Sequence, residues 1–442
     1  MTDIKRLRYV IQRTPIIDNH AHNLLLPTEI DRHPFHLITT EAQGEALEDV
    51  FASLPHIRAC RQLKELYEYE GPDEEWTWKR LLEIRKEWIT SRLDELNHKC
   101  LEGTHVILMD DGLNLTGDEV YPYQWHDSLT EAATRQIVRI ETEAELIMQY
   151  LHSITTAKDA QSEEFYNNIF YSFAELFEQV IRKMHDDSTV VGFKSVICYR
   201  SGLDVNPNYD AVVQQVHEPF HHYIHHFITN ADDPRRFRFD CKPLNDYLLL
   251  KTLQLLSEHE RPKPIQLHTG LGDNDMNLLH SNPAYLQPLI EAYSSVPFVL
   301  LHSAYPYTRE AGYLTTVFDN VYLDLGEVFP MISRDGQEKV LRQAMELTPS
   351  SKLLWSTDGH LFGETYWLAN KQFREVLEQV RRFSVFLMLL LLQFNFMSSI
   401  PLTIFTKVSE FSFDVRRLKS VGMLLLRTSF ILKVREIFLS TL

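Results

Sequence analysis

The feature that most constrains the fold is a series of short apolar segments, each ending in polar or charged residues and followed by a helix-like stretch. Eight such segments occur, at residues 16–18, 105–109, 137–140, 190–197, 264–267, 296–301, 321–323 and 353–355. Apolar runs of this length are typical of buried strands, and their alternation with helical patterns is typical of a parallel sheet. The sequence therefore predicts an α/β fold.

Two parallel architectures fit this alternation, a closed barrel and a doubly wound open sheet. The count of eight strands favours a (β/α)8 TIM-type barrel. The sequence also has no GxGxxG after the first strand and no Walker-type phosphate loop, which an open nucleotide-binding sheet would call for. Residues 40–100 carry Leu, Glu, Arg and Trp at helical spacing, so we expect a helical insertion after the first strand. Residues 1–382 are then one barrel domain.

Four histidines and one aspartate stand at the ends of four predicted strands. His20 and His22 are two residues apart, so on a strand their side chains share a face and can bind one ion. His268, His302 and Asp358 each follow a later strand. The strand ends of a barrel meet at one mouth, so we expect the five side chains to lie together. Imidazole and carboxylate are the ligands of catalytic zinc, which activates water.

Composition narrows the classes of partner. The formal net charge of −17 argues against binding nucleic acid or an anionic membrane, because those partners require clustered Lys and Arg. Four widely spaced cysteines form no CxxC pair, which indicates reduced thiols in a cytoplasmic protein: Cys60, Cys100, Cys198 and Cys241. The charged residues 1–14 lack the apolar core of a signal peptide.

Six segments resemble the amidohydrolase-related (amidohydrolase 2) family, specifically the barrel domain found fused to a glutamine-synthetase-like domain in fungal and plant proteins. They are IIDNHAHN, GFKSVICYRSGL, IQLHTGLGDNDMNL, VLLHSAYPYTREAGYL, VYLDLGEVFPMISRDGQ and LLWSTDGHLFGETYWLA, within residues 15–380. The resemblance implies a metal-dependent hydrolase. It also implies metal ligation by His20, His22, His268 and Asp358, with His302 as a further ligand or as a group that polarises the substrate.

For the mechanism we expect Asp358 to take a proton from water and pass it to the leaving group, while the metal and His302 stabilise the developing oxyanion. Asp358 as a metal ligand alone stays an alternative. In part of the superfamily a lysine on strand four is carbamylated and bridges two ions, and Lys194 falls on the fourth predicted strand. Because Lys194 lies several residues before the end of that strand, we expect one zinc ion rather than two.

Loops after strands four and six carry candidate substrate-binding residues. They are Arg200, Arg309, Tyr305 and Tyr307. An arginine there suits a substrate carboxylate because its planar group binds two oxygens, although ordinary surface ion pairs are the alternative. Asp110 and Glu141, after strands two and three, could orient a ligand histidine. His360 and Glu364 are weaker candidates.

The composition changes after residue 383. Residues 381–442 hold nine Lys or Arg and three acids, and residues 383–405 read FSVFLMLLLLQFNFMSSIPLTIF. This atypical, apolar and basic tail has three interpretations: a membrane anchor, a packed extension of the barrel, or non-native coding such as read-through of an intron. We expect no glutamine-synthetase-like domain within these 442 residues.

The leading hypothesis is hydrolysis of a C–N (amide-like) or related bond of a small molecule. A decarboxylase of the same superfamily would use the same metal ligands, and a catalytically inactive barrel serving as a signalling or scaffold module is a third alternative. The identity of the substrate and the oligomeric state, including a homo-oligomer, stay open at this stage.

Overall fold

A closed ring of parallel strands forms the centre of the molecule. The computed structural model describes residues 3–113, 117–154, 163–229 and 238–380. Its strands are β1 (Ile16–Ala21), β2 (Thr104–Asp110), β3 (Arg135–Arg139), β4 (Val190–Ser195), β5 (Ile265–Leu267), β6 (Phe298–Leu300), β7 (Val321–Asp324) and β8 (Leu353–Leu354). Each pairs in parallel with its neighbour in sequence, in the order β1 to β8. The predicted (β/α)8 barrel and its eight strands are confirmed.

The segment after β8 completes the ring. Backbone amides of Asn19 and His22 donate to the carbonyl oxygens of Trp355 and Gly359, at 2.9 and 2.7 Å, and the Asp358 amide donates to the His20 carbonyl at 3.0 Å. The buried Asp18 carboxylate also accepts hydrogen bonds from the Thr357 amide and hydroxyl, at 2.9 and 2.5 Å. Residues 355–359 therefore join the first strand to the last.

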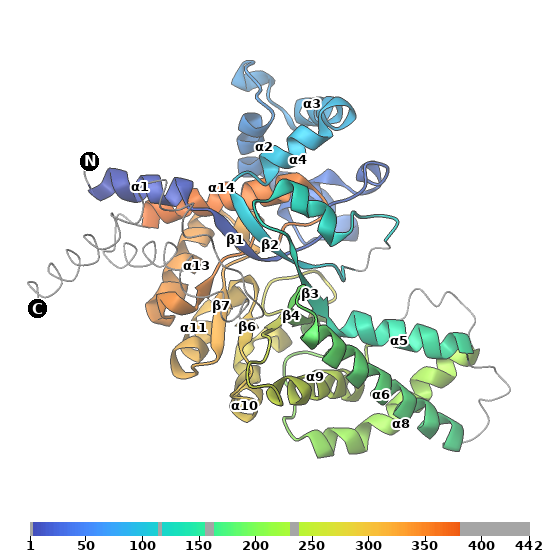
Figure 1. Cartoon of the computed structure of the whole chain (residues 1–442). Helices are drawn as coiled ribbons and strands as arrows, with labels where there is room; N and C mark the ends of the chain where they lie inside the picture. Colours follow the sequence, from blue (N-terminus) through green and yellow to red (C-terminus); the bar gives the residue numbers. More distant parts are fainter. Residues whose placement is uncertain (1–2, 114–116, 155–162, 230–237, 381–442) are drawn as a thin grey trace, which may run out of the picture.

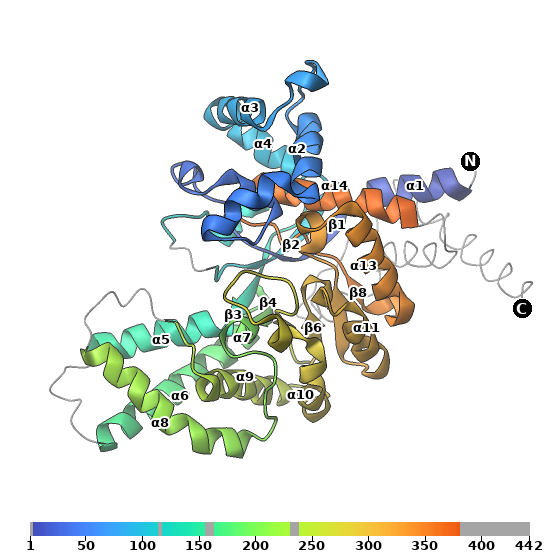
Figure 2. The same ribbon diagram turned by 180° about the vertical axis from the view of Figure 1, so that it is seen from behind.

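Helices surround the barrel and form two lobes beside it (Figures 1 and 2). The helices are α1 (Asp3–Arg13), α2 (Leu54–Leu66), α3 (Trp78–Ser91), α4 (Leu93–Cys100), α5 (Ile140–Ile154), α6 (Glu163–Asp186), α7 (Ile197–Arg200), α8 (Tyr209–Thr229), α9 (Lys242–Ser257), α10 (Gln287–Ala292), α11 (Thr308–Val317), α12 (Val328–Met331), α13 (Arg334–Leu347) and α14 (Gly363–Val380). Between β1 and β2, α2–α4 make the predicted helical insertion. A second lobe of α5, α6, α8 and α9 was not predicted.

The insertion is fixed to the barrel by a buried polar cluster. Arg85 of α3 donates from Nε to the Glu364 carboxylate of α14 at 2.7 Å, and the Tyr67 hydroxyl donates to the same oxygen. The Arg85 guanidinium also lies 3.7 Å from the ring centroid of Phe35 and 4.8 Å from that of Phe362. A buried charge is stable only when it is paired and hydrogen-bonded, so this cluster sets how the insertion packs.

The predicted tail, residues 383–442, lies outside the described residues. Within the described part of the chain, no helix combines the length and apolar character needed to cross a bilayer.

Candidate metal centre

Side chains from β1 and from the segment after β8 converge at the mouth of the barrel. His20 and His22 point their Nε2 atoms at one oxygen of Asp358, with Nε2–Oδ1 distances of 3.4 and 3.5 Å. His20 lies in β1 and His22 directly follows it, so the period of two places both rings on the inner face, as expected from the sequence. His20 is fully buried and His22 is 6% exposed. The His–x–His pair and Asp358 therefore form one cluster, although they are far apart in the chain.

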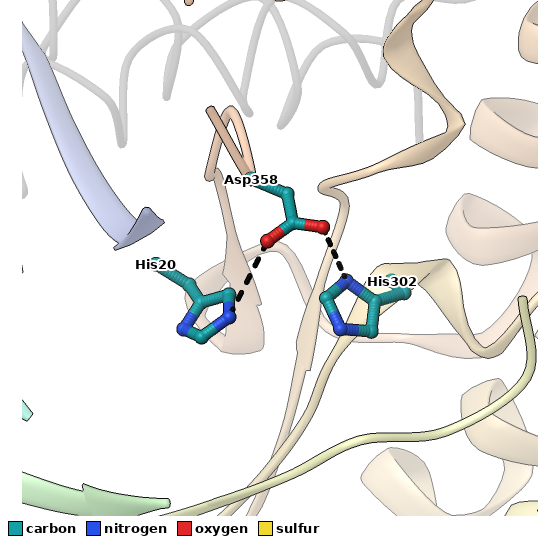
Figure 3. Close-up of side chains that lie close together, drawn as sticks. All are labelled: His20, His302 and Asp358. Carbon is teal, nitrogen blue, oxygen red and sulfur yellow. Dashed lines mark ion pairs between the residues drawn. The ribbon is translucent and has the colours of Figure 1, made fainter. Parts of the chain in front are cut away.

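The ends of β5 and β6 add two more imidazoles to this cluster. His302 Nδ1 lies 3.7 Å from the second oxygen of Asp358, so the carboxylate sits between the His20 and His302 rings (Figure 3). The His268 ring packs against His302 with centroids 4.3 Å apart. The structure thus brings together all five residues that the sequence places at strand ends.

Two neighbours orient the β1 histidines. Gln266 of β5 accepts a hydrogen bond from His20 Nδ1 at 2.9 Å, and its amide nitrogen donates to the Asn19 carbonyl at 2.7 Å. His22 Nδ1 donates to the carbonyl oxygen of Asp110 at 2.7 Å. Because a carbonyl oxygen can only accept, Nδ1 carries the proton in each ring and Nε2 presents its lone pair to the centre. This is the arrangement that metal-binding histidines use.

A Gln266→Leu variant is expected to bind zinc about 10–100-fold more weakly, because His20 loses the acceptor that fixes its tautomer and ring orientation. The zinc dissociation constant can be measured by competition with a chromophoric chelator. Gln136, whose amide binds Asp111 near the start of β3, provides the matched control. Equal dissociation constants for Gln266→Leu and the unmodified protein would show that Gln266 does not orient His20.

Burial sets the protonation states in the cluster. Desolvation, with the charge of Lys194 adding to it, lowers the pKa of His20 and His268 well below the usual range and lowers that of His302 to about 3. Desolvation would raise the pKa of Asp358, but its contacts with the imidazoles of His302, His22 and His20 hold it well below its usual value. Neutral imidazoles around an ionised carboxylate are the protonation states that a metal requires.

Three polar residues at the site have left-handed backbone conformations. The φ angles are +64° at His302, +59° at Glu327 and +51° at Asp358. Such angles cost energy for residues other than glycine, and they cluster at functional sites where the surrounding structure enforces them. The ends of β6, β7 and β8 therefore hold these side chains in imposed positions.

Lys194 reaches the cluster. Its Nζ lies 3.5 Å from His20 Nε2, and burial lowers its pKa to about 8. The charges of Asp110 and Asp358 act on it in the opposite direction. We predicted that Lys194 could lie too deep and pair with a core carboxylate, but this contact places it beside the candidate ligands.

Two residues near the site were not predicted from the sequence. Glu327, after β7, is 3% exposed and lies with Oε2 3.4 Å from His302 Nδ1. Burial raises its pKa well above the usual range, and the charges of Glu41 and Asp358 add to this effect. Tyr199 packs its ring 4.2 Å from that of His268. Glu327 and Tyr199 lie after strands β7 and β4, which is the signal that could have found them.

The predicted substrate-binding residues differ in their placement. Arg200 is buried at the end of α7 and lies 3.7 Å from Glu145. Tyr305 and Tyr307 are partly exposed after β6, and the Tyr307 hydroxyl donates to the Leu278 carbonyl at 3.0 Å. Arg309 instead projects to solvent with its side chain 62% exposed and pairs with Glu346 of α13 at 3.0 Å. The structure does not bring Arg309 to the cluster.

The weaker candidates have largely structural partners. The Asp110 carboxylate pairs with Arg139 at 2.6 Å, and the Asp110 backbone carbonyl accepts the hydrogen bond from His22. Glu141 accepts hydrogen bonds from the Ser195 hydroxyl and the Val196 amide, at 2.6 and 3.1 Å. Glu364 binds Arg85, as described above. His360 bonds to the Asp358 carbonyl at 2.9 Å and therefore borders the site.

The residues of the cluster fit a divalent cation. Four buried polar atoms there have no hydrogen-bond partner among the described residues, namely His268 Nε2, His302 Nδ1, Glu327 Oε2 and Asp358 Oδ1. Unpaired buried polar atoms are costly, and each of these atoms can bind a metal. Two groups of side chains have ligand atoms close enough to share an ion: His20, His302 and Asp358, and His20, His22 and Asp110.

Comparison with known sequences tests the family resemblance. Residues 220–383 match a family model described as amidohydrolase. Protein fluG of Emericella nidulans is 47% identical over 387 residues, which are 86% of this chain and 44% of fluG. The predicted resemblance to the amidohydrolase family is confirmed. The chain spans less than half the length of this curated relative. The more specific resemblance, to barrels that are fused to a glutamine-synthetase-like domain in other proteins, stays a prediction.

Solved structures show the same barrel. A Lactobacillus casei protein assigned as a metal-dependent hydrolase is 25% identical, with a TM-score of 0.65 over 88% of this chain and 94% of its own. Uronate isomerase of Thermotoga maritima, 15% identical, covers 91% of this chain and 97% of its own with a TM-score of 0.56. Glucuronate isomerase of Caulobacter crescentus, 10% identical, covers 92% and 95% with a TM-score of 0.53. The two isomerases share the fold alone.

Proposed function

We propose that this amidohydrolase-family protein is a metal-dependent hydrolase that cleaves a C–N or related bond of a small molecule. In this proposal one zinc ion is held by His20, His22, His268 and Asp358, with His302 as a further ligand or a substrate-polarising group. The observation that supports it most is the convergence of two imidazole Nε2 atoms on Asp358 Oδ1 within 3.5 Å. Neutral imidazoles with a carboxylate are the ligand set of catalytic zinc.

When bound, the ion would supply a Lewis acid that activates water for attack near neutral pH. Asp358 accepts the proton of that water and returns it to the leaving nitrogen. Its position suits this task because Oδ1 faces the β1 histidines while Oδ2 lies toward His302. An ionised Asp358 is required for the first transfer, and the low pKa of this carboxyl provides it.

Other side chains bind and orient the substrate. His302 is neutral, so it can donate one hydrogen bond to the carbonyl oxygen on which negative charge develops. Burial raises the pKa of Tyr199 well above its usual value, with the charges of Glu327 and Glu41 adding to this effect, so its hydroxyl stays a hydrogen-bond donor. Tyr199 and His268 form one wall of the site, and Gly272 lies against both of them.

The proposal is tested first by elemental analysis of the purified protein. We expect about one zinc per chain, lost in His20→Ala and Asp358→Ala because each variant removes a ligand. His98→Ala is the matched control, since His98 is exposed on α4 and bonds only locally to the Asp94 carbonyl at 2.7 Å. Folded protein that neither contains nor takes up metal would contradict the proposal, and two ions per chain would favour the carbamylated form of Lys194.

Product analysis then separates hydrolysis from the related metal-dependent decarboxylation. The zinc-loaded protein is incubated with a panel of amides and of ring carboxylates. Release of an amine supports hydrolysis, whereas release of carbon dioxide supports the decarboxylase. A metal-loaded protein that releases neither would support the scaffold alternative.

A further inference from the structure

The second lobe carries a row of histidines along one face of α8 (Figures 1 and 2). This helix reads HEPFHHYIH over residues 217–225, so His217, His221 and His225 follow one another at intervals of four. Residues spaced by four lie on the same helix face. His217 and His221 are half-buried, and His225 is exposed. The row borders the apolar stripe by which α8 packs into the lobe, namely Val216, Phe220 and Ile224.

Aromatic side chains of α6 hold these imidazoles in place. The His217 ring centroid lies 4.3 Å from that of Phe170, and the His221 ring centroid lies 5.3 Å from that of Tyr166. The Tyr166 hydroxyl is also hydrogen-bonded to His225 Nδ1 at 2.8 Å. Within the described residues the His217 ring makes ring contacts and no hydrogen bond, so its nitrogens are available to an ion. The neighbouring helix therefore orients the row, as the surroundings of metal-binding histidines do.

The first two histidines of the row have the spacing of a metal-binding pair. The pattern H-E-x-x-H on a helix places two imidazoles on one face, where they bind a single zinc ion. The ring centroids of His217 and His221 are 6.4 Å apart. In a pair that shares one zinc ion through bonds of about 2 Å, the ring centroids lie about 5 Å apart. Rotation of the two side chains by a small angle is enough to bring the rings to that separation, because it moves them closer by only about 1 Å.

The charges around the row favour a cation. α8 contains no Lys or Arg, and it contains two acidic residues, Asp210 and Glu218. The basic residues of α6, Arg182 and Lys183, lie near its C-terminal end and far from Tyr166. No ammonium or guanidinium group of α6 or α8 therefore competes with an ion for the histidines.

We propose that His217 and His221 bind a zinc ion on the second lobe. This site shares no residue with the cluster at the barrel mouth, and the proposal does not depend on the hydrolase function. Imidazole nitrogens suit zinc and its neighbours copper and nickel, whereas magnesium and calcium prefer oxygen ligands. Because the pair supplies only two ligands, water completes the coordination and the ion exchanges readily. We therefore expect this zinc to be lost during purification and to return when zinc is added.

Calorimetric titration of zinc chloride into the purified full chain tests the proposal. We expect about one zinc per chain to bind beyond the zinc that the protein already holds. His217→Ala and His221→Ala should each weaken this binding about tenfold or more, because each removes one of the two ligands. His222→Ala is the matched control, since His222 is exposed on another face of the same helix and bonds only to the Glu218 carbonyl at 3.2 Å. Magnesium chloride should not bind at this position.

Further variants separate this site from the barrel and from a loss of folding. His20→Ala should lose the barrel zinc and keep the added one, so failure of the proposed function is distinguished from failure of the lobe site. Lys194→Met should also keep it, which excludes a second ion in the barrel. His217→Gln keeps a side chain of similar size against Phe170 and should weaken binding as much as His217→Ala. No additional zinc, binding that survives in both His217→Ala and His221→Ala, or equal weakening by His222→Ala would each overturn the proposal.

Discussion

A Glu364→Ala variant is expected to have a free energy of unfolding about 3–5 kcal/mol below that of the unmodified protein, because it leaves Arg85 as an uncompensated buried charge. The Arg85 and Glu364 side chains are only 8% and 2% exposed, so water cannot replace the lost carboxylate. The Tyr67 hydroxyl loses its acceptor at the same time. Urea unfolding, followed by tryptophan fluorescence, measures the difference.

Two further variants make this prediction specific. Glu375 lies on α14, as Glu364 does, and pairs with Arg58. Because the Glu375 side chain is 39% exposed, we expect Glu375→Ala to lower the free energy of unfolding by less than about 1 kcal/mol. The double variant Arg85→Met, Glu364→Leu should recover most of the loss, because apolar groups can replace a buried ion pair at little cost. Equal destabilisation by Glu364→Ala and Glu375→Ala would show that the buried cluster does not hold the insertion in place.

An Asp358→Asn variant is expected to turn over amide substrates about 10²–10⁴-fold more slowly, because a carboxamide cannot accept the proton of water. The loss should appear in kcat rather than in KM, since Asn has nearly the same size and the substrate-binding walls are unchanged. Steady-state amine release by zinc-loaded protein measures both constants, with zinc content determined for each sample.

Asp319→Asn, at an exposed position in the turn before β7, is the matched control and should retain full activity. If Asp358→Asn kept its zinc and its kcat, Asp358 would not be the proton acceptor. A variant that kept kcat per bound zinc but held less zinc would instead indicate the alternative role, in which Asp358 is a metal ligand alone.

The barrel strands were predictable because most of their side chains are apolar and buried. In β4 all six residues are buried, and only Lys194 and Ser195 are polar. The second helical lobe was not predicted, since its longest helices, α6 and α8, lie inside the connections that follow β3 and β4. A helical pattern shows that a helix forms but not whether it covers the barrel or extends from it. The number of strands could therefore be predicted, whereas the size of the connections could not.

The metal cluster could be predicted because its members follow strands and a barrel brings strand ends together. Glu327 also follows a strand, but a lone Glu in DLGEVF gives no indication that its side chain is buried against a histidine. Gln266 was missed because an amide within an apolar strand carries no metal-binding pattern. Arg309 was predicted near the site, but its side chain faces solvent. It lies in the first turn of α11, and the sequence does not show which side of that turn faces the mouth of the barrel.

The joining of β1 to residues 355–359 makes the metal centre a late product of protein synthesis. Asp18 and Thr357, which bond across this junction, are 339 residues apart in sequence. His20 and His22 leave the ribosome early and must wait for nearly the whole barrel before Asp358 can reach them. Contacts between such distant segments form slowly, because a long loop must close first. Nascent chains that stop before β8 should therefore hold no zinc, and uptake of metal should mark the moment at which the ring is complete.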